Sequence, residues 1–102
     1  MKINDDAEMR GFILTMLKIN HPYGCSDQLI SVTLNENDFF VSPALLSSHI
    51  RYLEEKELVR VEDVKNMKLG ISRTMVFITH KGIDLLAGDI PPEPGVLVPS
   101  LE

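Results

Sequence analysis

Apolar residues recur at steps of three and four in the first half of the chain, a period typical of amphipathic helices. The first predicted helix is capped by Asp5 or Asp6 and runs to about residue 19, before the turn at residues 20–24. A shorter helix follows Ser26 or Asp27. The clearest helix start is Ser42-Pro43, because a hydroxyl N-cap and a proline in the first turn both favour initiation. The buried stripe predicted for this third helix and the residues after it is Leu46, Ile50, Leu53 and Leu58.

After residue 57 the pattern changes from a helical period to alternation. Residues 58–62 and 71–79 alternate between apolar and polar positions, which predicts two half-buried strands. The polar stretch 63–70 predicts a long loop that joins them into a hairpin. Thr79 is placed to cap a last helix over residues 80–87, and Gly88 is placed to end it. The proline-rich residues 90–95 cannot form a helix and predict an extended segment.

These elements predict an α+β fold that is mainly helical, with a three-helix bundle, a β-hairpin and a C-terminal helix. A chain of 102 residues that is 44% hydrophobic is suited to one domain with one core. We expect the domain to span residues 1–88 and an extended proline-rich tail to span residues 89–102. Residues 101–102 could be a remnant of an expression vector.

Charge is unevenly distributed along the chain. The formal net charge is −5, whereas domains that bind nucleic acid are typically basic. Residues 59–88 nevertheless hold five Lys or Arg against three Asp or Glu, while the residues on either side are acidic. The positive charge is therefore concentrated in the predicted hairpin and last helix.

Several classes of chemistry lack the residues that they need. The single Cys25 allows no internal disulfide and no multi-thiolate zinc site, and the three histidines have no partners at ligand spacing. The sequence has no glycine-rich phosphate loop, no nucleophile motif and no carboxylate pair at catalytic spacing. No apolar run approaches the length of a membrane span, and no signal peptide is evident. We therefore expect a cytoplasmic protein that is not an enzyme and uses no metal or cofactor.

The order of elements across residues 5–88 resembles the winged-helix superfamily. Residues 46–61, LSSHIRYLEEKELVRV, resemble the recognition helix and first wing strand of bacterial regulators of the MarR and ArsR type. The segment THKGIDLL at residues 79–86 resembles the T-x-x-G-x-x-x-L motif that follows their wing. More narrowly, HPYG at 21–24 and IPPEPG at 90–95 resemble small winged-helix proteins of Mu-like prophages. The chain departs from the regulators at Ser48, where Arg or Lys is frequent, and at Glu57, where Gly is usual.

The resemblance implies a sequence-specific DNA-binding transcription regulator, with the third helix in the major groove and the wing on the DNA backbone or minor groove. It also implies a symmetric dimer, for which Phe12 and Leu85 are candidate seam residues. The alternative is a winged-helix module that binds another protein without significant DNA binding. A positive third-helix face continuous with the wing would favour DNA, and a neutral or acidic face with an exposed Leu45 would favour a protein partner. The candidate DNA-binding residues are Ser47, Ser48, His49 and Arg51 on the helix and Arg60, Lys65, Lys68 and Arg73 on the wing.

Overall fold

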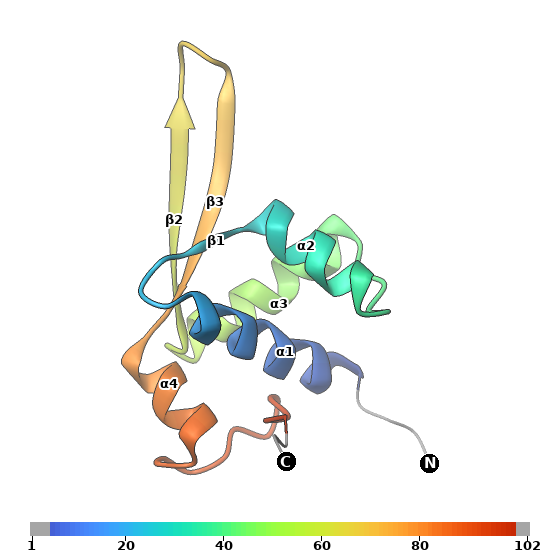
Figure 1. Cartoon of the computed structure of the whole chain (residues 1–102), viewed down its shortest axis with the longest axis vertical. Coiled ribbons are helices and arrows are strands. Elements are labelled where there is room, and N and C mark those ends of the chain that lie inside the picture. Colours follow the sequence, from blue (N-terminus) through green and yellow to red (C-terminus); the bar gives the residue numbers. More distant parts are fainter. Residues whose placement is uncertain (1–4, 100–102) are drawn as a thin grey trace.

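The computed structural model describes residues 5–99 and has the predicted order of elements, with one short strand added (Figure 1). The elements are α1 (Asp5–Asn20), β1 (Cys25–Ser26), α2 (Asp27–Glu36), α3 (Pro43–Glu55), β2 (Val59–Asn66), β3 (Ile71–Ile78) and α4 (His80–Ala87). The predicted α+β class and helix order are confirmed. The suggested vector remnant, residues 101–102, lies outside the described residues.

Side-chain caps fix where the helices begin, as the sequence predicts. The Ser26, Ser42 and Thr79 side chains accept hydrogen bonds from the backbone N–H of Leu29, Leu45 and Gly82. Each bond satisfies a first-turn N–H that has no partner within its helix. Gly88 ends α4 in the left-handed conformation, with φ 79°. These local signals place the start of α3.

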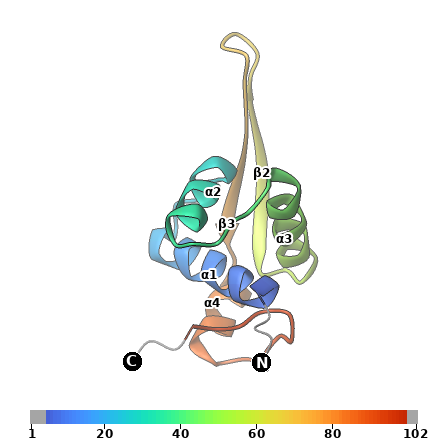
Figure 2. The same cartoon turned by 90° about the vertical axis from the view of Figure 1, so that its right-hand side faces the viewer.

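The core lies where helices α1, α2 and α3 meet the base of the hairpin. Figures 1 and 2 show these helices gathered at one end of the molecule, with α2 and α3 on either side of the hairpin base. The largest fully buried apolar side chains come from all of these elements: Ile13, Leu14, Leu17, Ile30, Leu34, Leu53, Leu58 and Val76. Their burial removes apolar surface from water, and this supplies the main driving force for folding.

Within residues 5–99 the strands form an antiparallel sheet in the order β1-β3-β2. The register pairs Val59 with Ile78 and Val61 with Val76, so these four side chains share one face of the sheet. Val59, Ile78 and Val76 are buried, which places this face against the helices. The strand β1 pairs Cys25 with Val76, and no alternation over two residues could have predicted it.

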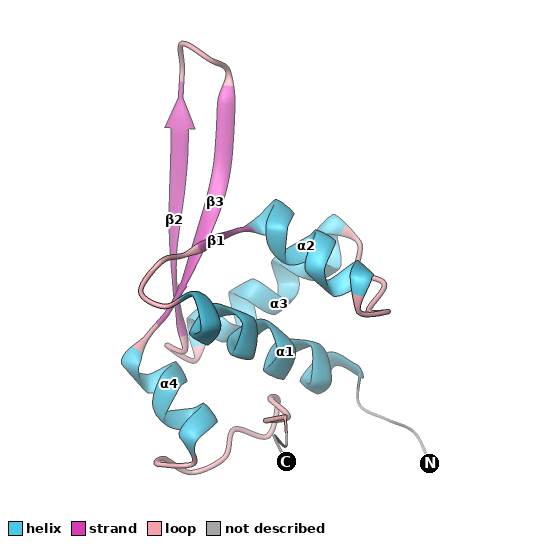
Figure 3. Ribbon diagram, in the orientation of Figure 1, coloured by secondary structure: helices cyan, strands magenta, loops and turns pink. Residues whose placement is uncertain are grey.

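The predicted loop over residues 63–70 is wrong for its first half. Strand β2 continues to Asn66, and the register runs from Asp63 opposite Thr74 to Asn66 opposite Ile71. The hairpin projects beyond the helices at this point, as Figure 3 shows, so both of its faces meet solvent. A strand with no buried face does not need alternating apolar and polar residues. Its sequence can therefore be polar throughout and resemble that of a loop.

Residues beyond α4 pack back onto α1. The Val96 side chain is buried, and the Leu97 N–H donates to the Ala7 carbonyl over 2.9 Å. A β-carbon at Gly11 would lie 1.7 Å from the Leu97 carbonyl oxygen, so only glycine permits this approach. The segment predicted to be extended is thus part of the packed structure up to residue 99.

The two residues suggested for a dimer seam do not form a free apolar surface. Leu85 is only 3% exposed and belongs to the core, so its assignment to a dimer seam is wrong. Phe12 is half-buried, and its ring packs against that of Phe39 with centroids 5.3 Å apart.

Among the described residues, no helix is long and apolar enough to cross a membrane.

Candidate nucleic-acid interface

The outer face of α3 carries three of the four helix residues that the sequence nominates. Ser47, Ser48 and Arg51 are exposed, whereas His49 is 1% exposed and lies among the buried residues of the helix. The assignment of His49 to a DNA-contacting face is therefore wrong. Position 49 follows Leu46 by three residues and precedes Leu53 by four, so it belongs to the buried stripe.

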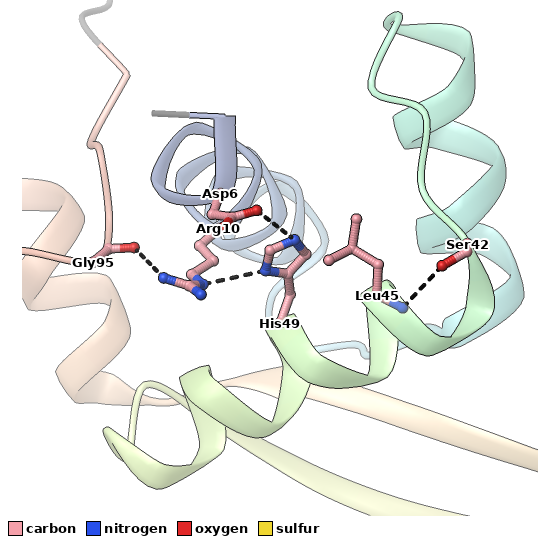
Figure 4. A network of polar contacts seen from close by, with 6 residues as sticks. All are labelled: Asp6, Arg10, Ser42, Leu45, His49 and Gly95. Atoms are coloured by element: carbon pink, nitrogen blue, oxygen red, sulfur yellow. Dashed lines mark hydrogen bonds and ion pairs between the residues drawn. The ribbon is translucent and has the colours of Figure 1, made fainter. Parts of the chain in front are cut away.

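The buried His49 is part of a polar network that reaches the protein surface (Figure 4). Its Nδ1 accepts a hydrogen bond from Nε of Arg10 over 3.2 Å, so in the neutral ring the hydrogen is on Nε2. That Nε2 lies 3.8 Å from Oδ1 of Asp6 and has no hydrogen-bond partner among residues 5–99. Burial and the nearby Arg10 guanidinium lower the pKa of His49 below its ordinary value, against the opposing effect of the Asp6 carboxylate. The surroundings of His49 therefore favour its neutral form.

Arg10 extends this network from α1 to the C-terminal segment. It donates through a terminal guanidinium nitrogen to the Gly95 carbonyl over 3.1 Å, and its guanidinium lies 3.9 Å from the centroid of the Tyr52 ring. The Tyr52 hydroxyl donates to Oε1 of Glu93 over 2.8 Å. Burial and then this hydrogen bond raise the pKa of Tyr52, while the same bond lowers the pKa of Glu93. The inner face of α3 is thus fixed to α1 and to residues 93–95, and this fixes the orientation of the outer face.

The hairpin of β2 and β3, residues 59–78, is called the wing from here on. A groove of about 450 Å³ lies between α2, α3 and the wing. Apolar side chains line its floor, including Leu46, Ile50 and Val61. Polar and charged side chains complete the lining: Asp27, Gln28 and Ser31 from α2, Ser47, Arg51 and Glu54 from α3, and Thr74 from β3. Arg51 is balanced by the acids Asp27 and Glu54, so the groove itself is not positively charged.

The hairpin register divides the wing's basic residues between two faces. Lys65 is on the same face as Val61 and Thr74, and therefore on the groove side. Arg73 is opposite Val64 on the other face, as are Arg60 and Phe77. The predicted positive cluster therefore surrounds the wing and does not form a single patch.

Arg60 differs from the other basic wing residues because it already has partners. It forms an ion pair with Glu62, and its guanidinium lies 4.3 Å from the centroid of the Phe77 ring. On the groove side, Oδ1 of Asp63 accepts a hydrogen bond from the Thr74 hydroxyl over 3.2 Å. Lys65, Lys68 and Arg73 are exposed, and no acidic residue occurs anywhere from Val64 to Ile83.

Sequence reasoning missed the contribution of α2 to the groove and the exposed apolar residues at the wing tip. Asp27, Gln28 and Ser31 depend on how α2 packs against α3, and no local pattern reports that packing. Glu54 could have been found, because it follows Ser47 and Arg51 at helical spacing. Residues 5–99 contain no group of three His, Cys, Asp or Glu side chains that could hold a metal ion.

Comparison with solved structures identifies similar folds. A PadR-like transcription factor from Bacteroides fragilis superposes with a TM-score of 0.61 and 21% sequence identity, over 76% of this chain and 74% of that one. A PadR family transcription regulator from hypervirulent Clostridium difficile R20291 superposes with a TM-score of 0.61 and 20% identity, over 78% and 83%. No protein-family model matches the sequence, and no curated protein matches it significantly. The chain has a winged-helix fold, of the kind that PadR-like regulators share.

Proposed function

We propose that this protein binds double-stranded DNA and regulates transcription, with α3 in the major groove and the wing on the phosphate backbone. The observation that carries the proposal is that the exposed Ser47 and Arg51 of α3 line a groove with Val61 and Thr74 of the hairpin, on the hairpin face that also carries Lys65. The two similar structures are described as a PadR-like transcription factor and a PadR family transcription regulator, which supports this class of function.

The residues of α3 have the chemistry to read base edges. The hydroxyls of Ser47 and Ser48 can donate or accept, and Arg51 can donate two hydrogen bonds to guanine or contact a phosphate. We assign His49 no contact with DNA, because it is buried against Arg10. Its role in the proposal is to hold the helix at the correct angle.

The wing has the charge that the helix lacks. Lys65, Lys68 and Arg73 are exposed, while Asp27 and Glu54 oppose phosphate within the groove. Arg60 is left out of the phosphate contacts because Glu62 already neutralises it. We therefore propose that the wing contributes more of the affinity than α3.

A salt titration measures how many of the phosphate contacts come from the wing and how many from α3. Four phosphate contacts per chain, from Arg51 and the three wing residues, give a slope of log K against log salt of about −3.6, and a dimer on two half-sites doubles it. The experiment is fluorescence polarisation with a duplex of about 30 base pairs at low salt. Changing Lys65, Lys68 and Arg73 to Ala should reduce the slope per chain to about −1.

Single substitutions with matched charge loss provide the control. Lys81→Ala removes an exposed positive charge on α4, away from the groove, and should change the slope less than Lys68→Ala does. Absence of binding at about tens of micromolar wild-type protein would refute the proposal. Binding that is equally sensitive to Lys81→Ala and Lys68→Ala would refute the assignment to the wing. Sedimentation velocity with and without duplex measures whether the protein is a dimer, as the resemblance implies.

A second function, docking of another protein in the groove, is favoured by the apolar floor and by Asp27 and Glu54 on its walls. The double change Asp27→Asn with Glu54→Gln separates the two functions. If DNA occupies the groove, removing these two charges should tighten DNA binding. If a protein occupies it, neither the wild type nor the double variant should bind the duplex.

A further inference from the structure

The tip of the wing exposes apolar side chains that the fold does not use. Met67 is 91% exposed and Leu69 is 69% exposed, and behind them Val64 is 48% and Ile71 is 39% exposed. Several exposed apolar side chains close together in one short hairpin tip can mark a binding site. None of these four residues belongs to the hydrophobic core or to the residues packed against it.

Hydrogen bonds hold the backbone of the tip in a defined turn. Oδ1 of Asn66 accepts hydrogen bonds from the N–H groups of Lys68 and Leu69, over 3.1 and 3.2 Å. Gly70 adopts φ 62°, a conformation that costs little only for glycine, and it returns the chain to the last pair of the ladder. A loop fixed in this way loses little conformational entropy when it binds a partner.

The positive charge around the tip indicates a negatively charged partner. The protein carries a net −5, yet Val64 to Ile83 contains no acid, and Lys65, Lys68 and Arg73 surround the tip. Lys65 and Arg73 lie on opposite faces of the hairpin. A partner that presents negative charge on two sides of an apolar centre matches this arrangement, and a DNA groove has phosphates on both walls and stacked bases between them.

The length of the wing matches the spacing of DNA grooves. Val61 lines the groove beside α3, and Met67 lies six residues further along the hairpin, which is about 20 Å in an extended strand. Half a turn of B-DNA, which separates a major groove from the next minor groove, is about 17 Å. Figures 1 and 2 show that the tip stands clear of α2 and α3.

We propose that Met67 and Leu69 form an apolar wedge that enters the minor groove, partly unstacks a base step and bends the DNA, while Lys68 contacts a flanking phosphate. This inference rests on the proposed function, because it requires α3 in the adjacent major groove. Methionine and leucine are among the side chains that proteins insert between base steps in this way.

The test uses an A·T-rich duplex of about 30 base pairs that contains TpA steps and carries a donor and an acceptor dye at its ends, because TpA steps unstack readily. Energy transfer reports the bend, and fluorescence anisotropy reports binding. Wild-type protein should raise the energy transfer at saturation. The double change Met67→Ala with Leu69→Ala should remove most of that rise and weaken binding by about threefold to tenfold, while leaving the salt slope unchanged. Lys68→Ala should leave the rise in energy transfer in place and make the salt slope shallower by about 0.9.

The matched control is Ile19→Ala, which removes an apolar side chain that is 79% exposed near the end of α1, on the helical body and away from the wing tip. It should leave both the bend and the affinity unchanged. Binding by wild-type protein with no rise in energy transfer, or a full bend by the double variant, would overturn the wedge and leave the proposed function intact. Absence of any binding by wild-type protein would overturn both. A loss of self-association in the double variant, measured without DNA by sedimentation, would reassign the tip to a contact between copies of the chain.

Discussion

The end of α3 places a non-glycine residue in a left-handed conformation. Glu57 has φ 63°, its N–H donates to the Glu54 carbonyl, and the N–H of Leu58 donates to the Leu53 carbonyl. These two bonds are those of the helix-ending motif that usually has glycine at the left-handed position. The Glu57 carbonyl also accepts from the Thr79 hydroxyl over 2.7 Å. The backbone is therefore held from both sides and cannot relax out of the strained conformation.

The change Glu57→Gly should stabilise the protein. Left-handed backbone costs a residue with a β-carbon about 1–2 kcal/mol, and glycine removes this cost. Glycine also loses about 0.5–1 kcal/mol more conformational entropy on folding than alanine. The difference leaves a net gain of about 0.5–1 kcal/mol in the free energy of unfolding, and the melting temperature should rise by about 2–6 °C.

Urea denaturation followed by far-ultraviolet circular dichroism measures this gain. The midpoint should rise while the m-value stays constant, because the surface exposed on unfolding is unchanged. Glu57→Ala is the control, since it removes the same exposed carboxylate but keeps the β-carbon. A glycine variant no more stable than the alanine variant would show that position 57 carries no left-handed strain.

Three further predictions test the contacts that position α3 and the C-terminal segment. The pKa of His49 is lowered in the folded protein, so the unfolded state binds a proton there more readily. The contribution of His49 to the free energy of unfolding should be complete above about pH 6.5 and decrease below it. Urea denaturation at a series of pH values should show a smaller decrease for His49→Gln than for the wild type. Gly11→Ala should displace the Leu97 carbonyl, destabilise the fold by about 1–3 kcal/mol and speed hydrogen exchange at the Leu97 amide; unchanged exchange would contradict this contact. Ser42→Ala should cost about 1 kcal/mol in the same denaturation assay, because the Leu45 N–H loses its cap, whereas Ser42→Asp should retain most of the stability.

Local chemistry explains which parts of the fold the sequence could predict. Ser26, Ser42 and Thr79 cap the helices that follow them, and Gly88 ends α4, because each acts on backbone groups within a few residues. Glu57, where the regulators that the chain resembles usually have glycine, is left-handed in the structure. Such signals need no knowledge of the tertiary structure.

His49 shows where a local reading of the sequence stops. Its spacing from Leu46 and Leu53 fits the buried stripe, but a histidine is expected at the surface unless a partner satisfies it. That partner, Arg10, lies 39 residues away in sequence and reaches His49 because α1 packs beside α3. The burial of His49 therefore depends on a contact that only the tertiary structure creates.

In the wing, the sequence does not reveal on which face of the hairpin each basic residue lies, and these positions affect how the wing could bind DNA. The sequence correctly concentrates positive charge near the hairpin, but the face that each residue occupies depends on register, and beyond Val61 no buried side chain reveals it. The register places Lys65 on one face and Arg73 on the other. A flat anionic surface could contact only one of these faces at a time. A DNA groove has a phosphate backbone on each side, so a tip inserted between its walls can use both residues at once, and the division of charge that weakens a surface patch favours insertion.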